Sequence, residues 1–361
     1  MNRDHTIKAL TCTVALGTVA TLGFASVSQA EEQIRWRFPS AFGTNLISLG
    51  TPAADFADNL ERATNGRIQV RVYEPGELVD AFEVLDAVST GRVQAGFGQP
   101  IYDQGTIPAA PLFASVPFGP KAWSYTAWWF HGDGQELMKE VYANHGYEVH
   151  PILCGLTGPE TAGWYSEPIT SVDDYDGMTI RFAGLGGRVV EKFGASVTMT
   201  PGGELFQALE RGVIDAVEFS MPAVDQIIGF QDVVNYNMFP GWHQTHLSSY
   251  VLVNNDVWEN TSEADQVLIE NICTATALRG LVEGEAANGR VLAELEEEGV
   301  NLEMIPEDVL RELKRASEEV MQAEADRDDD FRRVWESQQE FMETYSIWER
   351  RGYLPPESVD W

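Results

Sequence analysis

Two charged side chains interrupt apolar segments that are otherwise predicted to be buried strands. Arg181 lies near the end of the segment MTIRF (178–182), and Glu218 lies near the end of VIDAVEF (213–219). Burying either charge is costly unless an opposite charge accompanies it. The planar fork of Arg181 suits a ligand carboxylate, but a nearby Asp or Glu of the chain would also satisfy it. The pattern therefore leaves two interpretations of Arg181 open, an anion-binding residue and a structural salt bridge.

A third charged residue, Glu160, lies in the segment CGLTGPETAGWYSEPI (154–169), which is predicted to cross between two lobes. A carboxylate in such a crossover could coordinate a cation or cap a turn, and the sequence favours neither. A second crossover is predicted at FPGWHQTH (239–246). Its Trp242 could form the wall of a cleft or pack in the core, and its Gln244 is a candidate polar contact to a ligand.

The sequence carries little that would support catalysis. The segment GLGG (184–187) lacks the third glycine of a dinucleotide-binding fingerprint, because Val189 stands at that position. His243 and His246 have a spacing that suits a metal, but we expect them to be rim or surface histidines of a polar loop. We find no P-loop, no nucleophile elbow and no pair of general acid and base. The sequence therefore predicts a binding protein and not an enzyme.

Residues 1–30 have the order of a secretory signal: a basic start, a short apolar stretch and the small-residue site Ser28-Gln29-Ala30. Cleavage is expected near Ala30, which would leave the mature protein in the periplasm. The rest of the sequence contains no apolar run of the ~18–20 residues that a membrane-spanning helix needs.

The chain is strongly acidic, with 24 Lys and Arg against 56 Asp and Glu and a formal net charge of −32. Such a surface repels nucleic acid and anionic lipid, so we expect no nucleic-acid partner. A salt-rich habitat would explain the charge through screening, and an ordinary acidic exported protein would also fit. Cys154 and Cys273 are the cysteines left after cleavage. They could pair, but we expect two free buried thiols.

Two segments of the chain share an alternation of strands and helices. The first runs through 34–97 and the second through 178–219, each in the order strand, helix, strand, helix, strand. Within them DAVSTGRVQAGF (86–97) aligns with QALERGVIDAVE (207–218), so that in both a helix stops at a glycine and a strand follows. The repetition predicts an α/β protein of two similar lobes with largely parallel sheets.

The remaining sequence is predicted to be helical, over 263–298 and in one long helix over 306–345. At ~1.5 Å per residue the second helix would be about 60 Å long, which exceeds a single lobe. Such a helix would either brace both lobes of a monomer or pack against a second subunit, and we expect a homodimer.

Together these segments resemble the solute-binding subunits of the tripartite ATP-independent periplasmic (TRAP) transporters. The resemblance covers nearly all of the chain after the signal, and it is carried by MTIRFAGLGGRVVEKFGASVTMTPGGELFQALERGVIDAVEFSMP (178–222), GPETAGWY (158–165) and YNMFPGWHQ (236–244). The long block and its Pro-Gly-Trp turn look most like the branch that binds 2-oxo acids, lactate and similar small monocarboxylates. The family implies a two-lobed α/β periplasmic binding protein fold with a hinge, here followed by long C-terminal helices.

The resemblance also implies a binding site. Its ligand-binding residues would be Arg181, Glu160, Glu218, Phe219, Trp242 and Gln244. Arg181 would receive the ligand carboxylate, and a cation, Na⁺ or Ca²⁺, would bridge ligand and protein. The metal set in this sequence would be Glu160, Glu218, Phe219 and Gln244. Members of the branch more often carry glutamine at the hinge and an acid after Pro-Gly-Trp. In this sequence the acid, Glu160, stands at the hinge and the glutamine, Gln244, follows Pro-Gly-Trp. This exchange leaves the identity of the cation open.

We therefore expect a receptor that captures a small carboxylic acid and delivers it to the TRAP integral-membrane subunits. The expected domains are a signal peptide at 1–30, lobe I at 31–155 with about 243–275, lobe II and a hinge helix at 156–242 with about 276–305, and a C-terminal helix and tail at 306–361. One alternative is a member of the same family that binds a sugar acid or a zwitterionic compatible solute without a metal. Another is a receptor that reports to a sensor.

Overall fold

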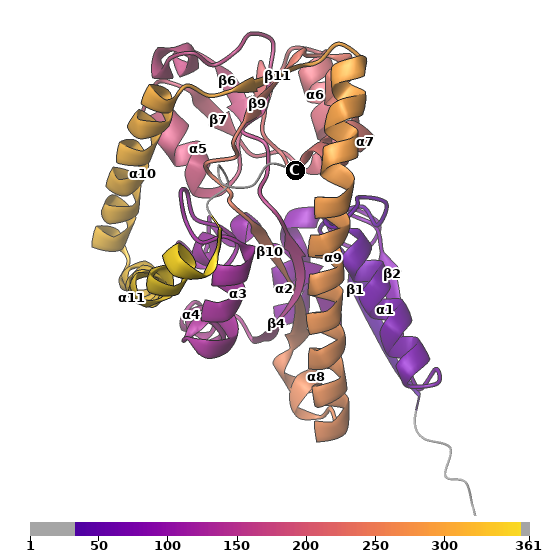
Figure 1. Ribbon diagram of the computed structural model, residues 1–361. Helices are drawn as coiled ribbons and strands as arrows, with labels where there is room; N and C mark the ends of the chain where they lie inside the picture. Colours follow the sequence, from indigo (N-terminus) through magenta and orange to yellow (C-terminus); the bar gives the residue numbers. More distant parts are fainter. Residues whose placement is uncertain (1–32, 355–361) are drawn as a thin grey trace, which may run out of the picture. The chain divides into compact units, whose positions relative to one another are not determined.

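Alternating apolar residues build the first sheet of the structure, a computed structural model that describes residues 33–354 (Figure 1). Strand β1 (Ile34–Pro39) pairs in parallel with β2 (Ile68–Tyr73). Helix α1 (Thr51–Ala63) connects them and buries Phe56 and Leu60 completely. These elements confirm the strands and the helix predicted for this part of the chain. The predicted signal, with its cleavage near Ala30, lies outside the described residues.

A second sheet consists, in order, of the strands β3 (Ala95–Gly98), β10 (Leu247–Asn254) and β4 (Val149–Thr157). The central strand β10 runs antiparallel to both neighbours, and a bridge between Ser40 and Phe97 continues the pairing from β1 to β3. The prediction of a largely parallel sheet is therefore wrong for this region. The reason is that β10 enters from a distant crossover and not from a strand–helix–strand unit.

A third sheet has six strands. In order across the sheet they are β11 (Asn301–Met304), β9 (Tyr236–Phe239), β5 (Gly163–Tyr165), β8 (Ala216–Val217), β6 (Thr179–Arg181) and β7 (Ser196–Thr198). Strand β6 pairs in parallel with both β7 and β8. The helices between these strands are α5 (Gly184–Glu191), α6 (Leu205–Glu210) and α7 (Pro222–Ile228). Strand β11 was not predicted, and β8 is shorter than the predicted strand because the turn after Gly212 continues to Asp215.

The two helix–glycine–strand corners form as predicted. Helix α2 (Val84–Ser89) stops before Gly91, and α6 stops before Gly212. These glycines have φ angles of 70° and 66°, in the left-handed region that an L side chain adopts at a cost. Both corners therefore need glycine for the same conformational reason.

A disulfide bond fastens the long helix α9 (Glu263–Glu297) to strand β4. Cys154 of β4 and Cys273 of α9 are bonded, with 4.2 Å between their Cα atoms. The prediction of two free thiols is therefore wrong. Helix α9 packs along β4, and this contact brings together two cysteines separated by 119 positions in the sequence. In Figure 1 the same helix also runs beside α1 and α7, and both contacts are present in the structure.

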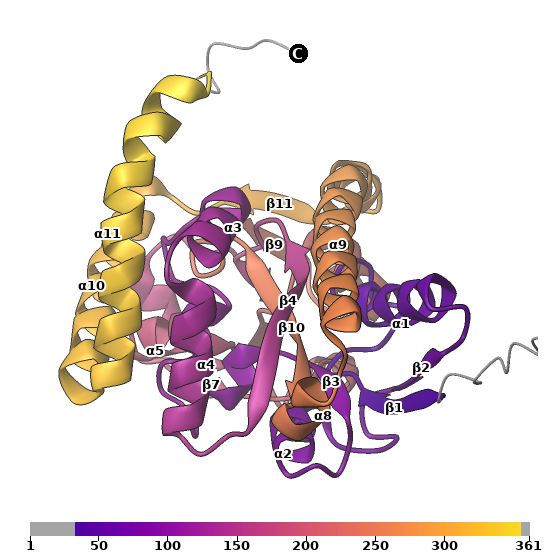
Figure 2. The ribbon, with the colours of Figure 1, turned by 90° about the horizontal axis from the view of Figure 1, so that it is seen from below.

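The C-terminal part consists of two helices and not one long helix. Helices α10 (Glu307–Arg327) and α11 (Asp329–Gly352) contact each other but run in different directions, as Figures 1 and 2 together show. Asp328 separates them, and its Oδ1 accepts a hydrogen bond of 2.6 Å from the backbone N–H of Phe331. The predicted continuous helix over 306–345 is therefore wrong, because Asp328 acts as the N-cap of a new helix.

The remaining elements surround these sheets. The other helices are α3 (Ala122–His131), α4 (Gly134–Asn144) and α8 (Asn255–Glu259), and the short 3₁₀ turns are η1 (Ala81–Glu83), η2 (Pro100–Asp103), η3 (Ala110–Phe113), η4 (Val172–Tyr175), η5 (Gly202–Glu204) and η6 (Phe230–Asp232). No helix within residues 33–354 combines the length and the apolarity that crossing a membrane requires.

Two crossovers join the second sheet to the third. Residues 158–162 lead from β4 to β5, and residues 240–246 lead from β9 to β10. They touch each other, because the backbone N–H of Glu160 donates a hydrogen bond of 3.1 Å to the carbonyl of Gln244. Side chains from both crossovers can therefore meet the ends of the strands of the third sheet. The exact division of the chain between lobes stays a prediction.

Candidate functional site

Arg181 and Glu218 meet at the carboxyl ends of two neighbouring parallel strands. Arg181 is the last residue of β6 and is aligned with Val217 of β8, so Glu218 directly follows the pairing. Both side chains are buried, at 1% and 0% exposed, and Arg181 Nη1 lies 3.1 Å from Glu218 Oε2. Arg181 also donates to the backbone carbonyls of Glu218 and Thr200. Ligands of open α/β sheets collect at this edge.

Hydrogen-bond donors satisfy both oxygens of Glu218. The backbone N–H of Ala183 donates to Oε2 at 2.9 Å, and Gln244 Nε2 donates to Oε1 at 3.1 Å. His243 Nε2 lies 3.1 Å from the same Oε1. Burial alone would raise the pKa of Glu218, but His243, Arg181 and the Ala183 N–H together lower it to about 2. Glu218 is therefore a carboxylate held by its neighbours.

Glu160 is the opposite case, a buried carboxyl group without such donors. Its side chain is 0% exposed, and within residues 33–354 neither Oε1 nor Oε2 has a hydrogen-bond partner. Burial, and after it the charge of Glu218, raises the pKa of Glu160 well above its usual value. Because its oxygens accept no bond from the described backbone, the turn-capping interpretation lacks support.

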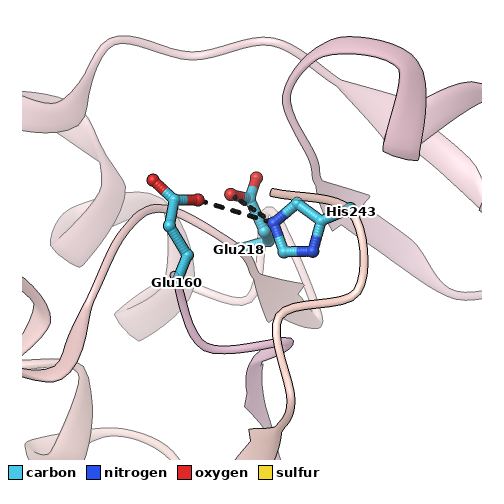
Figure 3. A group of neighbouring side chains, drawn as sticks. All are labelled: Glu160, Glu218 and His243. Carbon is cyan, nitrogen blue, oxygen red and sulfur yellow. Dashed lines mark hydrogen bonds and ion pairs between the residues drawn. The ribbon is translucent and has the colours of Figure 1, made fainter. Parts of the chain in front are cut away.

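One nitrogen of His243 faces both carboxyl groups (Figure 3), although the sequence predicted a rim or surface histidine. Its Nε2 is 3.1 Å from Glu218 Oε1 and 3.5 Å from Glu160 Oε2, and the residue is 1% exposed. His246 is also buried, and its Nδ1 contacts the carbonyl of Pro120 at 2.9 Å. The prediction of rim or surface histidines is therefore wrong, because the loop that carries them packs inside the protein.

A signal for His243 was present in the sequence. The residue stands between Trp242 and Gln244, both of which were predicted to belong to the site. The structure also explains part of GLGG without a nucleotide. A Cβ at Gly186 would lie 2.6 Å from the Cβ of His243, so glycine allows helix α5 to approach this loop closely.

A small cavity adjoins Arg181. The volume open to the centre of a water molecule is about 10 Å³, and the lining residues are Phe42, Leu49, Gln99, Ile101, Tyr102, Arg181, Ala183, Phe219, Gln244 and Leu247. Arg181 Cζ lies 5.1 Å from the centre of the Phe219 ring. Burial raises the pKa of Tyr102 to about 12, so its hydroxyl stays protonated. The cavity thus combines a guanidinium group with a mainly apolar wall, at the size of about one water molecule.

Trp242 packs away from this cavity. It is 2% exposed, and its ring centre lies 5.8 Å from that of Phe118 and 5.9 Å from that of Phe182. Among the described residues that line the cavity Trp242 does not occur. Its position favours core packing beneath the second crossover.

A third buried acid, Asp225, contacts strand β5. Asp225 of α7 is 0% exposed, and its Oδ2 accepts a hydrogen bond of 2.9 Å from the indole Nε1 of Trp164. Burial raises the pKa of Asp225 to about 8, although the bond from Trp164 opposes the shift. Asp225 therefore serves as a hydrogen-bond acceptor for Trp164 of strand β5.

The buried oxygens fit a cation. The three closest acid and imidazole ligand atoms, from Glu160, Glu218 and His243, lie within 4.8 Å of one another. Within the described chain, both oxygens of Glu160 and the Oε1 of Gln244 are buried without a hydrogen-bond partner. Unpaired buried oxygens are costly, and carboxylate and amide oxygens are the ligands that Ca²⁺ and similar hard cations take.

Comparisons with known proteins agree with this geometry. The family described as DctP, bacterial extracellular solute-binding protein family 7, matches residues 44–328. A monocarboxylate 2-oxoacid-binding periplasmic protein of Nostoc sp. is 32% identical over 356 residues, which covers 98% of this chain and 96% of the relative.

Two solved structures resemble the whole described fold. A TRAP transporter solute-binding protein of Bordetella bronchiseptica, a mixed-occupancy dimer with copurified calcium and picolinate, has a TM-score of 0.86 and 29% identity over 88% of this chain and 94% of that chain. A protein of Pseudoalteromonas atlantica with bound sodium and pyruvate has a TM-score of 0.83 and 28% identity over 88% and 96%. These likenesses confirm the two-lobed α/β fold with long C-terminal helices.

The match to the family extends over most of the chain, and the family consists of extracytoplasmic receptors and not of enzymes. The protein belongs to the family 7 extracellular solute-binding proteins, the solute-binding subunits of TRAP transporters.

Proposed function

We propose that this protein binds a small monocarboxylate of the 2-oxo-acid class, with a cation that bridges the ligand and the protein. One observation carries the proposal: the buried carboxyl group of Glu160 has no hydrogen-bond partner within the described residues, and it lies beside Glu218, which pairs with the buried Arg181. An arginine and a cation together provide the positive charge that an anion needs inside a protein of net charge −32.

We propose a small ligand because the space beside Arg181 has about the volume of one water molecule in this conformation and must widen even for pyruvate. Arg181 receives the carboxylate through its Nη2, because its Nε and Nη1 already donate to Thr200 and Glu218. The remaining wall consists largely of Phe42, Leu49, Ile101 and Leu247. These side chains accept a short hydrocarbon tail, and the polar Gln99 and Tyr102 of the same lining can contact the oxygen of a 2-oxo group. Pyruvate and its short homologues have the matching parts, a carboxylate at one end and a short apolar tail at the other.

The proposed cation is held by oxygens of both crossovers. Glu160 contributes its carboxylate and Gln244 its amide Oε1, with Glu218 and the neighbouring Phe219 completing the set. Both Glu160 and Gln244 present buried oxygens without a partner among residues 33–354. A cation bound there would draw the two crossovers toward the ligand, which would favour the closed arrangement.

We further propose the periplasm as the location, after cleavage near Ala30, and delivery of the ligand to the TRAP integral-membrane subunits. The family supports an extracytoplasmic receptor, and 32% identity to a periplasmic protein supports the compartment.

A homodimer is also proposed. The end of α11 and the residues after it expose large apolar side chains, namely Ile347, Trp348, Tyr353 and Leu354, at 54%, 61%, 57% and 75%. Such a concentration is typical of an interaction surface. The Bordetella bronchiseptica relative is a dimer, which supports the same assembly. Light scattering should give the mass of two chains, and the mass of one would contradict the proposal.

Calorimetric titration tests the ligand. We expect pyruvate or a short homologue to bind in the presence of Na⁺ or Ca²⁺ and to raise the midpoint of thermal unfolding. Arg181→Lys keeps the charge and loses the fork, so it should weaken binding by at least about tenfold. Binding of a zwitterionic solute or a sugar acid with no dependence on cations would keep the family and overturn the proposed ligand.

A further inference from the structure

The cavity beside Arg181 is lined by residues from two parts of the fold. Arg181 ends strand β6 of the third sheet, and Ala183 and Phe219 follow strands β6 and β8 of the same sheet closely. Phe42 and Leu49 come from the segment between β1 and α1. A ligand whose carboxylate contacts Arg181 therefore directs its tail toward the part of the lining that includes this segment.

The segment 43–50 is folded tightly on itself. The backbone N–H of Gly50 donates to the carbonyl of Leu46 at 2.8 Å, and the N–H of Leu46 donates to the carbonyl of Gly43 at 3.0 Å. A Cβ at Gly50 would lie 1.9 Å from the carbonyl oxygen of Gly43, so the two ends of the segment touch. Ser48 has a φ angle of 59°, which a residue with a side chain keeps only where its surroundings fix it. Leu49 stands between these two constrained positions.

Contacts outside the segment fix it further. Thr44 donates both its backbone N–H and its hydroxyl to the carboxylate of Glu74, directly after β2. The backbone N–H of Ser48 donates to the hydroxyl of Thr51, the first residue of α1, at 3.0 Å. Ser48 also lies against α9, where a Cβ at Gly284 would be 3.0 Å from its Oγ. The segment therefore cannot withdraw from the cavity without losing contacts to three neighbouring elements.

We propose that Leu49 limits the length of the ligand's tail, so that this protein selects pyruvate and 2-oxobutanoate over longer and branched 2-oxo acids. The inference rests on the proposed binding of a 2-oxo acid. Leu49 is 1% exposed, and the cavity that it lines is open to the centre of a water molecule over about 10 Å³. A ligand must therefore displace part of the lining, and interiors are packed closely enough that a fixed side chain excludes added methylene groups. The lining yields where its support is loose, and the support of Leu49 is not.

Leu247 offers the same side chain on a different support. It lines the same cavity, is 5% exposed and begins strand β10, directly after the crossover 240–246. Its position depends on that crossover, whereas Leu49 is held by its own segment and by the contacts to Glu74, α1 and α9. The two leucines therefore form a matched pair: truncation removes the same atoms from the same lining, at a fixed and at a differently supported position.

Calorimetric titration with a series of 2-oxo acids tests the inference. The ligands are pyruvate, 2-oxobutanoate, 2-oxopentanoate and 4-methyl-2-oxopentanoate, each with NaCl and CaCl₂ both present so that the cation is not limiting. In the wild-type protein we expect the affinity to fall by at least about tenfold from pyruvate to 4-methyl-2-oxopentanoate. Leu49→Ala should improve the binding of the longer acid relative to pyruvate by at least about tenfold. Leu49→Met, which nearly keeps the volume, should retain the wild-type order.

Three variants separate the role of Leu49 from cavity size and from stability. Leu247→Ala should change the ratio of affinities less than Leu49→Ala, and an equal change would assign the limit to the volume of the cavity and overturn the role of Leu49. Leu60→Ala removes the same atoms from a core position of α1 outside the lining and should leave the ratio unchanged. Gly50→Ala removes no lining atom but collides with the carbonyl of Gly43, so it should displace Leu49 and relax the ratio. An unchanged ratio in the folded Gly50→Ala protein would overturn the argument from the fixed segment.

The results distinguish this inference from the proposed function. Equal affinities of the wild-type protein for pyruvate and 4-methyl-2-oxopentanoate would overturn the length limit and leave the proposed function intact. Failure to bind any 2-oxo acid with either cation would overturn the proposed function itself. Circular dichroism checks that each variant is folded, and Leu49→Val, a smaller truncation, replaces Leu49→Ala if the latter is not. It should still improve the binding of 2-oxopentanoate relative to pyruvate.

Discussion

Two corners of the molecule have the same backbone and opposite chemistry. Residues 86–97 and 207–218 each pass from a helix through a left-handed glycine into a strand. The last aligned residues are Phe97 and Glu218, and both are 0% exposed. Apolar neighbours bury the ring of Phe97, while hydrogen-bond donors surround the carboxylate of Glu218. The backbone unit accepts either side chain, so the function of a corner depends on what the rest of the fold brings to the strand's end.

The same contrast extends to the regions around the corners. The apolar region, formed by β3, β10, β4 and α9, is held by packing and by the disulfide bond. The charged region, at the ends of β6 and β8, is held by groups that compensate one another. Changes in the apolar region should therefore reduce stability alone, and changes in the charged region should reduce stability and ligand binding together.

The largest effect is expected for Glu218→Gln. The substitution leaves the guanidinium of Arg181, which is 1% exposed, without its counter-charge. Removing one partner of a buried ion pair typically costs about 3–5 kcal/mol of unfolding free energy. Urea denaturation measures this loss, and calorimetry should show that binding of pyruvate with Ca²⁺ disappears.

The aligned position provides the control. Phe97→Leu should cost about 1–2 kcal/mol, because it removes part of a buried ring, and it should leave the pyruvate affinity unchanged. Equal losses of pyruvate affinity in Glu218→Gln and Phe97→Leu would show that both substitutions weaken binding only by destabilising the fold, and that Glu218 has no specific role in binding.

The next largest loss of stability is expected on removing the disulfide bond of the apolar region. Replacing both Cys154 and Cys273 by Ala removes a cross-link between residues 119 positions apart. Disulfides that close long loops contribute roughly 2–4 kcal/mol, chiefly by restricting the unfolded chain. Urea denaturation should show this loss, while the pyruvate affinity stays within about twofold of the wild type, since the bond lies outside the charged cluster.

Reductant gives the matched control for this pair. It should lower the stability of the wild-type protein toward that of the double Ala variant and should not change the variant itself. A double variant as stable as the wild type would contradict the contribution of the cross-link.

Local patterns predicted the apolar region well. The alternation in β1 and β2 and the helical spacing in α1 are set by residues close together in the sequence, so they are visible without a structure. The helix break at Asp328 was missed because the apolar stripe resumes at Phe331, which makes two successive helices look like one. The pairing of Cys154 with Cys273 depends on how α9 packs on β4, and no local pattern encodes it.

The charged region was predicted in part. A charge inside an apolar strand identified Arg181 and Glu218, since burial demands a partner. The meeting of Glu160 and Gln244 followed from the family resemblance, and the structure places both in contact with this cluster. His243 was missed because a histidine in a polar loop usually lies at the surface, and its burial is decided by helix α5 approaching through Gly186.

The smallest effect concerns a charge at the edge of the apolar region. Asp265, in the first turn of α9, accepts a hydrogen bond of 3.0 Å from Arg67 Nη1, and its side chain is 9% exposed. The hydrogen bonds from Arg67 hold the pKa of Asp265 below its usual value against the opposing effect of burial, and Ser262 adds to the lowering. A lowered pKa in the folded state means that the ionised form stabilises the fold.

The stabilisation by Asp265 should therefore depend on pH in a definite direction. It is present above the ordinary aspartate pKa of about 4 and is lost as the pH falls through the lower pKa of the folded state. Asp265→Asn should cost about 1 kcal/mol at pH 7, and the difference from the wild type should shrink at acidic pH. Glu263→Gln, in the same helical turn and exposed, should show a smaller difference at pH 7. If Asp265→Asn were equally destabilising at both pH values, the loss would come from packing and not from charge. The apolar region would then owe its stability to packing alone, even at the edge where Asp265 pairs with Arg67.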